Sequence, residues 1–133
     1  MLRPALERRG DVTLLGQVEG DQLLEAYAAA DVFALLSRRE PWGVVVNEAA
    51  ASGLPLVLSD RVGAAHDLLR DGENGFLVPA GDPAPAARAL RQLASDDVLR
   101  RAMGERSQEL VADWGYDASV ENFVAAVRAA IVS

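Results

Sequence analysis

Two residue types, cysteine and lysine, are absent from this sequence of 133 residues. Without cysteine, the chain can form neither disulfides nor thiolate metal sites, and its redox compartment stays undetermined. Without lysine, it has no phosphate-binding lysine of the P-loop kind and no lysine that could form a Schiff base. No Gly-x-Gly-x-x-Gly fingerprint follows an expected strand, so a dinucleotide site of that kind is not expected either.

Positive charge and long apolar runs are also scarce. The net charge is −7, and an acidic chain without a basic stripe is a poor nucleic-acid binder, so we expect no nucleic-acid partner. No apolar run approaches the roughly 20 residues that span a bilayer, and no basic, apolar leader opens the chain. We therefore expect a cytoplasmic protein. His66 is the single histidine and has no cluster of acidic residues beside it, so we expect no metal site.

Short apolar strands alternate with helical patterns along the chain. The expected strands are residues 12–15, 32–36, 56–58 and 76–78. The expected helices are residues 1–9, 22–30, 43–51 and 64–70, followed by helices that begin near Asp82, Asp96 and Asp117. The run 32–36 is apolar throughout, which is typical of a strand buried on both faces. The pattern predicts one α/β domain over residues 1–133, with a parallel Rossmann-like sheet flanked by helices and a helical C-terminal segment.

The loops after the expected strands contain most of the polar motif residues. In parallel sheets of this kind, ligands bind outside the carboxyl ends of the strands. The loops at those ends are residues 16–20, 37–43, 59–63 and 78–81. We therefore expect these four loops to lie together.

Two carboxylates, Glu40 and Glu48, stand on either side of the start of the helix 43–51. The free N–H groups at a helix start suit an anion, above all a phosphate, and Gly43 would let it approach the backbone closely. Glu48 shares a largely apolar helix face, where it needs donors such as ribose or sugar hydroxyls. The alternative is that Glu40 is a solvated loop acid and Glu48 a surface acid near a favourable helix end.

The same stretch resembles a known family. Residues 40–57 read Glu-Pro-Trp-Gly-Val-Val-Val-Asn-Glu-Ala-Ala-Ala-Ser-Gly-Leu-Pro-Leu-Val, which is similar to the E-x7-E signature of the GT-B retaining glycosyltransferases of family 4. Three more stretches occur in that family's order, Thr-Leu-Leu-Gly at 13–16, Ala-Asp-Val-Phe-Ala-Leu-Leu-Ser at 30–37 and Asp-Gly-Glu-Asn-Gly-Phe-Leu-Val at 71–78. The chain thus resembles a partial C-terminal, donor-binding domain of this family.

The resemblance implies a role for each of the motif residues. Glu48 would bind the ribose hydroxyls of a nucleotide, and Glu40, the expected catalytic residue, would contact the donor sugar. The backbone N–H groups of Trp42, Gly43 and Val44 would hold the diphosphate. For Trp42, packing beneath the loop is an open alternative to stacking on the ligand.

The loop at Gly16, Gln17 and Val18 would lie against the base, according to the same resemblance. Arg38 and Arg39 could neutralise phosphate charge, although a solvated basic pair that balances Glu40 is the simpler interpretation. The family often carries Gly-Gly where this chain has Val-Gly at 62–63, and Glu where it has Asp67.

The implied function is the nucleotide-sugar-binding portion of a retaining glycosyltransferase, which would transfer a glycosyl unit from a nucleoside-diphosphate sugar to an acceptor. The resemblance implies no cofactor and no metal ion. It also implies that an N-terminal acceptor domain and a first βαβ unit are missing, so we expect this chain alone to be inactive. The alternative is a non-catalytic α/β binding or assembly module with a vestigial pocket.

The missing unit would leave the strand 32–36 with an open edge. Residues 12–15 could pair directly with this strand, or a second copy of the chain could cover it. Of the two, we expect a homo-oligomer.

Overall fold

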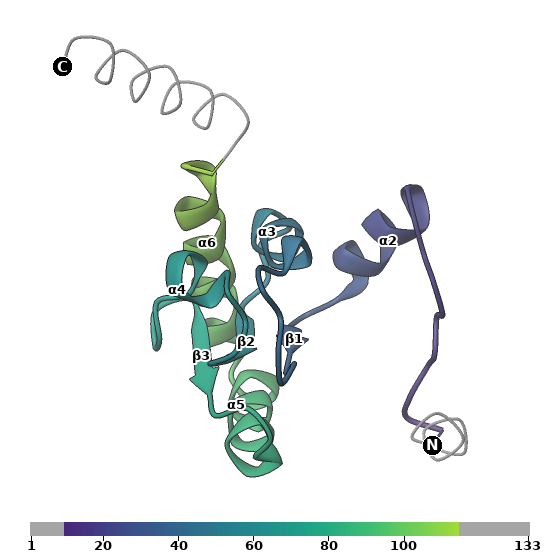
Figure 1. The fold of residues 1–133 in the computed structure, drawn as a ribbon. Helices are drawn as coiled ribbons and strands as arrows, with labels where there is room; N and C mark the ends of the chain where they lie inside the picture. The colour runs from purple at the N-terminus through teal and green to yellow at the C-terminus, as the bar shows by residue number, and fades with distance from the viewer. Residues whose placement is uncertain (1–9, 115–133) are drawn as a thin grey trace, which may run out of the picture.

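A computed structural model of the chain describes residues 10–114 (Figure 1). In chain order its elements are α2 (Asp21–Ala29), β1 (Phe33–Leu35), α3 (Val44–Ala51), β2 (Leu56–Ser59), α4 (Ala65–Leu68), β3 (Gly75–Val78), α5 (Pro83–Ser95) and α6 (Asp97–Ala112). The α/β class, the parallel sheet with flanking helices and the helical segment after the last strand are thereby confirmed. The helices expected in residues 1–9 and from Asp117 onward lie outside the described residues.

The sheet has three parallel strands in the order β1-β2-β3. Ala34 pairs with Val57 across the first two strands, and Val57 pairs with Phe76 across the second two. The central strand β2 is buried along its whole length, as its unbroken Leu-Val-Leu run predicts for a strand covered on both faces.

Alternate side chains of β2 enter two separate cores, because successive residues of a strand point to opposite faces. Leu56 and Leu58 pack with buried residues of α3 and α4. Val57 points the other way and packs with buried residues of α5 and with Met103 of α6. The helices therefore cover both faces of β2, and α6 runs behind the sheet beside α3 and α5 (Figure 1).

Two aspartates begin the C-terminal helices. The Asp82 carboxylate accepts a hydrogen bond from the Ala84 N–H at 3.0 Å, and Pro83 occupies the first helical position of α5. The Asp96 carboxylate accepts from the Leu99 N–H at 2.9 Å and caps α6. The sequence predicts helix starts near both residues, and aspartate before the first turn satisfies a free N–H group there.

A buried asparagine links three elements. Asn74 precedes β3 and has no exposed surface. Its amide nitrogen donates to the Leu68 carbonyl at the end of α4 and to Ser107 Oγ of α6, at 2.9 and 3.3 Å. Its amide oxygen accepts from the Arg70 N–H at 2.7 Å. The turn 71–75 therefore does more than reverse the chain, because it also fixes α4 against α6.

The N-terminal part of the described chain differs from the expectation. Residues 12–15 form no strand but an extended segment beside α2, which lies away from the sheet in Figure 1. A strand needs a neighbour to accept its backbone hydrogen bonds, and no described strand lies beside this segment. The expected strand at residues 12–15 is therefore wrong, and the described structure does not contain its pairing with residues 32–36, which was the alternative to a homo-oligomer.

The first strand of the sheet is also shorter and more exposed than expected. β1 has three residues, its middle residue Ala34 is exposed, and Leu36 lies beyond the strand with 43% of its surface exposed. The prediction of a strand buried on both faces is wrong here: within residues 10–114, β1 lies at the edge of the sheet, has β2 as its only neighbouring strand and is nowhere fully buried.

Candidate functional site

Three of the four motif loops meet at the carboxyl edge of the sheet. The Ser59 hydroxyl donates to the Ser37 carbonyl at 2.6 Å, and the Glu40 N–H donates to the Arg61 carbonyl at 3.0 Å. The Asp60 N–H donates to the Val78 carbonyl at 2.9 Å, which joins the third loop to the second. The loops 37–43, 59–63 and 78–81 therefore lie together, as predicted.

A hollow of about 520 Å³ opens between the first two of these loops. We call it the Glu40 hollow. Its lining residues are Arg38, Arg39, Glu40, Pro41, Asp60, Arg61, Val62, Gly63 and His66. Val62 is fully buried and forms an isolated parallel bridge with Glu40, so the loop with the candidate catalytic acid is fastened to the loop beneath it.

The start of α3 has the open donors that an anion site needs. Gly43 is the N-cap residue and has a left-handed backbone, with φ of 90°. A Cβ at this position would lie 3.3 Å from Cγ of Glu40 and 3.3 Å from Cδ2 of Leu35, so a side chain would be both strained and crowded there. Within residues 10–114, the N–H groups of Gly43 and Val44 have no hydrogen-bond acceptor.

Glu40 lies beside this helix start. Its Oε1 accepts a long hydrogen bond from the Trp42 N–H at 3.4 Å. One of the three N–H groups predicted to hold a diphosphate is therefore directed at a carboxylate of the chain itself. The other two remain open.

Glu48 lies one turn further along α3 and has an unexpected partner. The Tyr27 hydroxyl of α2 donates to Glu48 Oε2 at 2.8 Å, and only 8% of the Tyr27 surface is exposed. Burial, together with the hydrogen bond to Glu48 and the negative charge of that carboxylate, raises the pKa of Tyr27 to about 12. In the sequence, Tyr27 stands at helical spacing with Leu23 and Leu24 in the expected helix 22–30, which assigns it no other role. Nothing in its local pattern predicts a partner 21 residues away.

A second hollow, of about 370 Å³, lies next to Glu48 and is separate from the Glu40 hollow. Its lining residues are Asn47, Glu48, Ala51, Val111, Ala112 and Trp114. The Asn47 side-chain oxygen is buried there and accepts no hydrogen bond within the described part of the chain. The two acids of the motif therefore line different hollows at the start of one helix.

Trp42 packs within the protein. Its ring contacts the ring of Trp114, with centroids 5.7 Å apart and planes inclined by 45°. It also packs against the core on the α3 side of the sheet. These contacts fit the packing interpretation of this residue, and stacking on a ligand stays a prediction.

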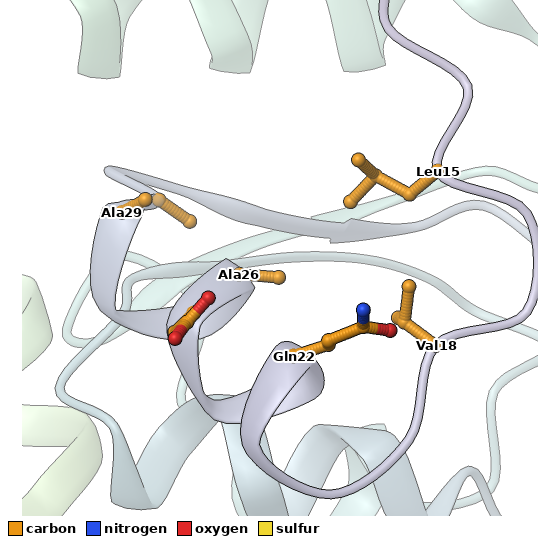
Figure 2. Close-up of a pocket in the computed structure, with 7 residues that line it drawn as sticks. Leu15, Val18, Gln22, Ala26 and Ala29 are labelled. Carbon is orange, nitrogen blue, oxygen red and sulfur yellow. The ribbon is translucent and has the colours of Figure 1, made fainter.

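Gly16, Gln17 and Val18 do not join the other three loops. A third hollow, of about 530 Å³, lies between their segment and α2. Figure 2 shows Leu15 and Val18 facing Gln22 and Ala26 of α2 across it. The expectation that all four loops meet is therefore wrong for residues 16–20.

The described residues contain no group of three or more acidic, histidine or cysteine side chains that could hold a metal ion. No helix within the same residues is long and apolar enough to cross a membrane. Sequence reasoning missed Arg61 and the placement of His66, which the fold brings to Arg38 and Arg39. No sequence signal marks these residues, because Arg61 lies in the loop after β2 and His66 in α4, both distant in sequence from Arg38 and Arg39.

Comparison with known proteins gives consistent matches. The sequence pattern of the family described as glycosyl transferases group 1 matches residues 3–110. A D-inositol 3-phosphate glycosyltransferase from Corynebacterium diphtheriae is 43% identical over 101 residues, which are 76% of this chain and 23% of that protein. The chain thus spans about a quarter of the length of this relative.

Solved structures agree with this match. Sucrose-phosphate synthase from Thermosynechococcus elongatus superposes with a TM-score of 0.85 and 30% identity, over 98% of this chain and 34% of that one. Anabaena HepE, in complex with UDP and glucose, gives a TM-score of 0.78 and 26% identity, over 97% and 34% of the two chains.

Proposed function

The chain belongs to the group 1 glycosyltransferases, and on that premise we propose that it forms the nucleotide-sugar-binding portion of a retaining, family 4 enzyme of the GT-B fold. Such an enzyme transfers a glycosyl unit from a nucleoside diphosphate to an acceptor and retains the anomeric configuration. The transfer is proposed to need no metal ion, as the family resemblance implies.

The observation that carries this proposal is the pair of acids at the start of α3. Glu40 and Glu48 flank a helix start where the N–H groups of Gly43 and Val44 have no acceptor in the described structure. A diphosphate would accept from these groups, and the helix dipole favours its negative charge. In HepE, a protein of the same fold, UDP and glucose are bound.

Glu48 is proposed to bind the ribose. Tyr27 already donates to its Oε2, which fixes the carboxylate in one orientation. Its other oxygen, Oε1, has no hydrogen-bond donor within residues 10–114 and can accept from a ribose hydroxyl. A carboxylate that is held in this way loses little further freedom when the nucleotide binds.

Glu40 is proposed to contact the transferred sugar. Its carboxylate lies at the helix start and lines the Glu40 hollow, which is large enough for a hexose. A negative charge in this position would stabilise the positive charge that develops on the sugar during transfer.

The alternative is a non-catalytic binding module, and one observation favours it. Glu40 and Glu48 line two different hollows rather than one continuous cleft. Sugar transfer by the isolated chain does not separate the two functions, because we expect no turnover under either, so titration with UDP, GDP and ADP is the discriminating test.

Calorimetric titration with UDP, GDP and ADP tests the nucleotide site. We expect one of the three to bind, and Glu48→Ala to weaken it by roughly 1–3 kcal/mol, because ribose hydroxyls would lose their acceptor. Glu105→Ala is the matched control, since Glu105 is an exposed acid on α6. Equal affinity of the wild type and Glu48→Ala would refute the ribose role. If none of the three nucleotides bound, the proposed function itself would be refuted.

A further inference from the structure

The Glu40 hollow gathers three arginines in a chain whose net charge is negative. The whole chain carries a net charge of −7, yet Arg38, Arg39 and Arg61 all line this hollow. His66, the only histidine, lines it as well. The arginines come from two loops that are distant in sequence, so the fold and not a local basic run brings them together.

The guanidinium groups of this hollow have no ionic partner in the described structure. The ion pairs within residues 10–114 are made by Arg100 and Arg106, and none involves Arg38, Arg39 or Arg61. The hollow also holds two carboxylates, and each accepts a hydrogen bond from a backbone N–H. Asp60 Oδ1 accepts from the Ala80 N–H at 3.0 Å, and Glu40 Oε1 accepts from the Trp42 N–H at 3.4 Å. Both carboxylates keep their charge, so three arginines against two acids leave the hollow a formal excess of one positive charge, with no ion pair within the described residues that fixes any of its guanidinium groups.

Exposed arginines are common, and one or two would need no explanation. Here, three arginines line one hollow. The two loops that form the hollow are fastened together, because Val62 is buried and the Gly63 N–H donates to the Glu40 carbonyl at 2.9 Å. Arg38 also reaches the third loop, since its Nε lies 3.8 Å from the point where a Cβ on Gly81 would be. A planar guanidinium binds phosphate, sulfonate or carboxylate through paired hydrogen bonds, which a neutral sugar does not offer.

We propose that the Glu40 hollow binds an anionic group carried by a sugar, a phosphate, sulfonate or carboxylate, and that Arg38, Arg39 and Arg61 select such a sugar over its neutral counterpart. This inference rests on the proposed function, which gives the position of the nucleotide. In that proposal the diphosphate lies at the start of α3 and not in the Glu40 hollow. The anionic group has two possible sources, the transferred sugar and the acceptor.

Binding measurements with matched pairs of sugars test the proposal. UDP-glucuronate against UDP-glucose examines the transferred sugar, and glucose 6-phosphate against glucose examines an acceptor. We expect at least one charged member to bind about tenfold more tightly than its neutral partner, as charge-assisted hydrogen bonds imply. Raising the salt concentration should reduce this preference, because the hollow is open to solvent.

Variants assign the preference to the hollow. In Arg38→Gln/Arg39→Gln/Arg61→Gln, the preference for the charged sugar should fall to about onefold, while the affinity for UDP stays unchanged. Arg101→Gln, an exposed arginine on α6, is the control and should keep the preference. A preference for UDP-glucuronate over UDP-glucose would place the anionic group on the transferred sugar, and a preference for glucose 6-phosphate over glucose would place it on the acceptor.

Three results would overturn the inference. The first is equal binding of charged and neutral sugars by the wild type, including no binding of either. The second is a preference that survives in the triple variant. The third is a loss of UDP affinity in the triple variant without any sugar preference, which would place the diphosphate in the hollow. Failure of the proposed function would give a different result, namely that no nucleotide binds. The comparison of glucose 6-phosphate with glucose needs no nucleotide, so it tests the anion site even in that case.

Discussion

Tyr27 and Glu48 form a contact on which both the fold and the proposed ribose site depend. Tyr27 is the only buried residue of α2, and together with the half-buried Leu23 it packs this helix against the core. The same hydroxyl orients the Glu48 carboxylate at 2.8 Å. A residue that reads as ordinary core in the sequence therefore also holds a proposed binding acid.

We predict that Tyr27→Phe lowers the free energy of unfolding by about 1 kcal/mol near neutral pH, since it removes one hydrogen bond and keeps the ring. The free energy of unfolding should also depend on Tyr27 at alkaline pH. The folded pKa of Tyr27 is raised from 10.0 to about 12, first by burial and then by Glu48. Its contribution is therefore complete below pH 10 and is lost as the pH rises to about 12.

Urea unfolding at increasing pH measures both effects. The free energy of unfolding of the wild type should fall more steeply above pH 10 than that of Tyr27→Phe. Tyr116→Phe removes the other tyrosine of the chain and reports what that residue contributes. Parallel curves for the wild type and Tyr27→Phe would contradict the assigned pKa.

At the scale of elements, the position of α3 depends on its close contact with α6. Gly104 of α6 is buried against the turn that follows α3, and a Cβ there would collide with the Gly53 carbonyl oxygen. Helix α6 therefore approaches this turn as closely as only glycine permits. Because α3 carries Glu48 and begins at Gly43, this contact also supports the candidate site.

We predict that Gly104→Ala destabilises the protein by about 1–2 kcal/mol. Alanine by itself would stabilise a helix by about 1 kcal/mol relative to glycine, but the collision with a backbone atom that cannot rotate away should outweigh this gain. Chemical unfolding measures the difference. The control is Ala102→Gly at an exposed position of α6, which should cost about 1 kcal/mol through helix propensity alone. A stabilised Gly104→Ala variant would show that the two elements are not packed in this way.

At the scale of the whole molecule, one edge of the sheet, at β1, has no partner strand within residues 10–114. The Phe33 N–H donates to the Pro55 carbonyl, so the backbone groups of Ala34 point to the opposite, open side. Apolar residues with substantial exposure lie near this edge in the chain, among them Leu24 and Leu36. An unpaired edge with apolar neighbours is a template for pairing with another chain.

We predict that two copies of this chain pair along β1. Light scattering over a dilution series should show a dimer that dissociates as the concentration falls. Ala34→Pro removes the outward N–H and should weaken the dimer by about tenfold or more, whereas Ala34→Ser keeps that group and serves as the control. A monomer at every concentration would refute this prediction, as would a dimer that Ala34→Pro leaves unchanged.

Local sequence predicts most elements of this fold because their causes are local. The apolar run at 56–58 gives a buried strand, and Asp82 and Asp96 start the two long helices through hydrogen bonds within their own first turns. The convergence of the loops after β1, β2 and β3 also follows from the sequence, since parallel strands present their carboxyl ends at one edge. Residues 12–15 are different, because strand formation depends on a neighbour that is not encoded in the segment itself.

The sequence by itself determined the group 1 glycosyltransferase family, the α/β class, the order of the elements from α2 to α6 and the placement of Glu40 and Glu48 about one helix start. These follow from short-range patterns, namely the period of apolar residues, the caps and the spacing of the motif. Only the tertiary structure decided that Tyr27 holds Glu48, that Arg61 and His66 join Arg38 and Arg39 in one hollow, and that residues 16–20 lie beside α2. Each of these is a contact between segments distant in the chain, and such contacts arise from the packing of whole elements, which local spacing does not specify.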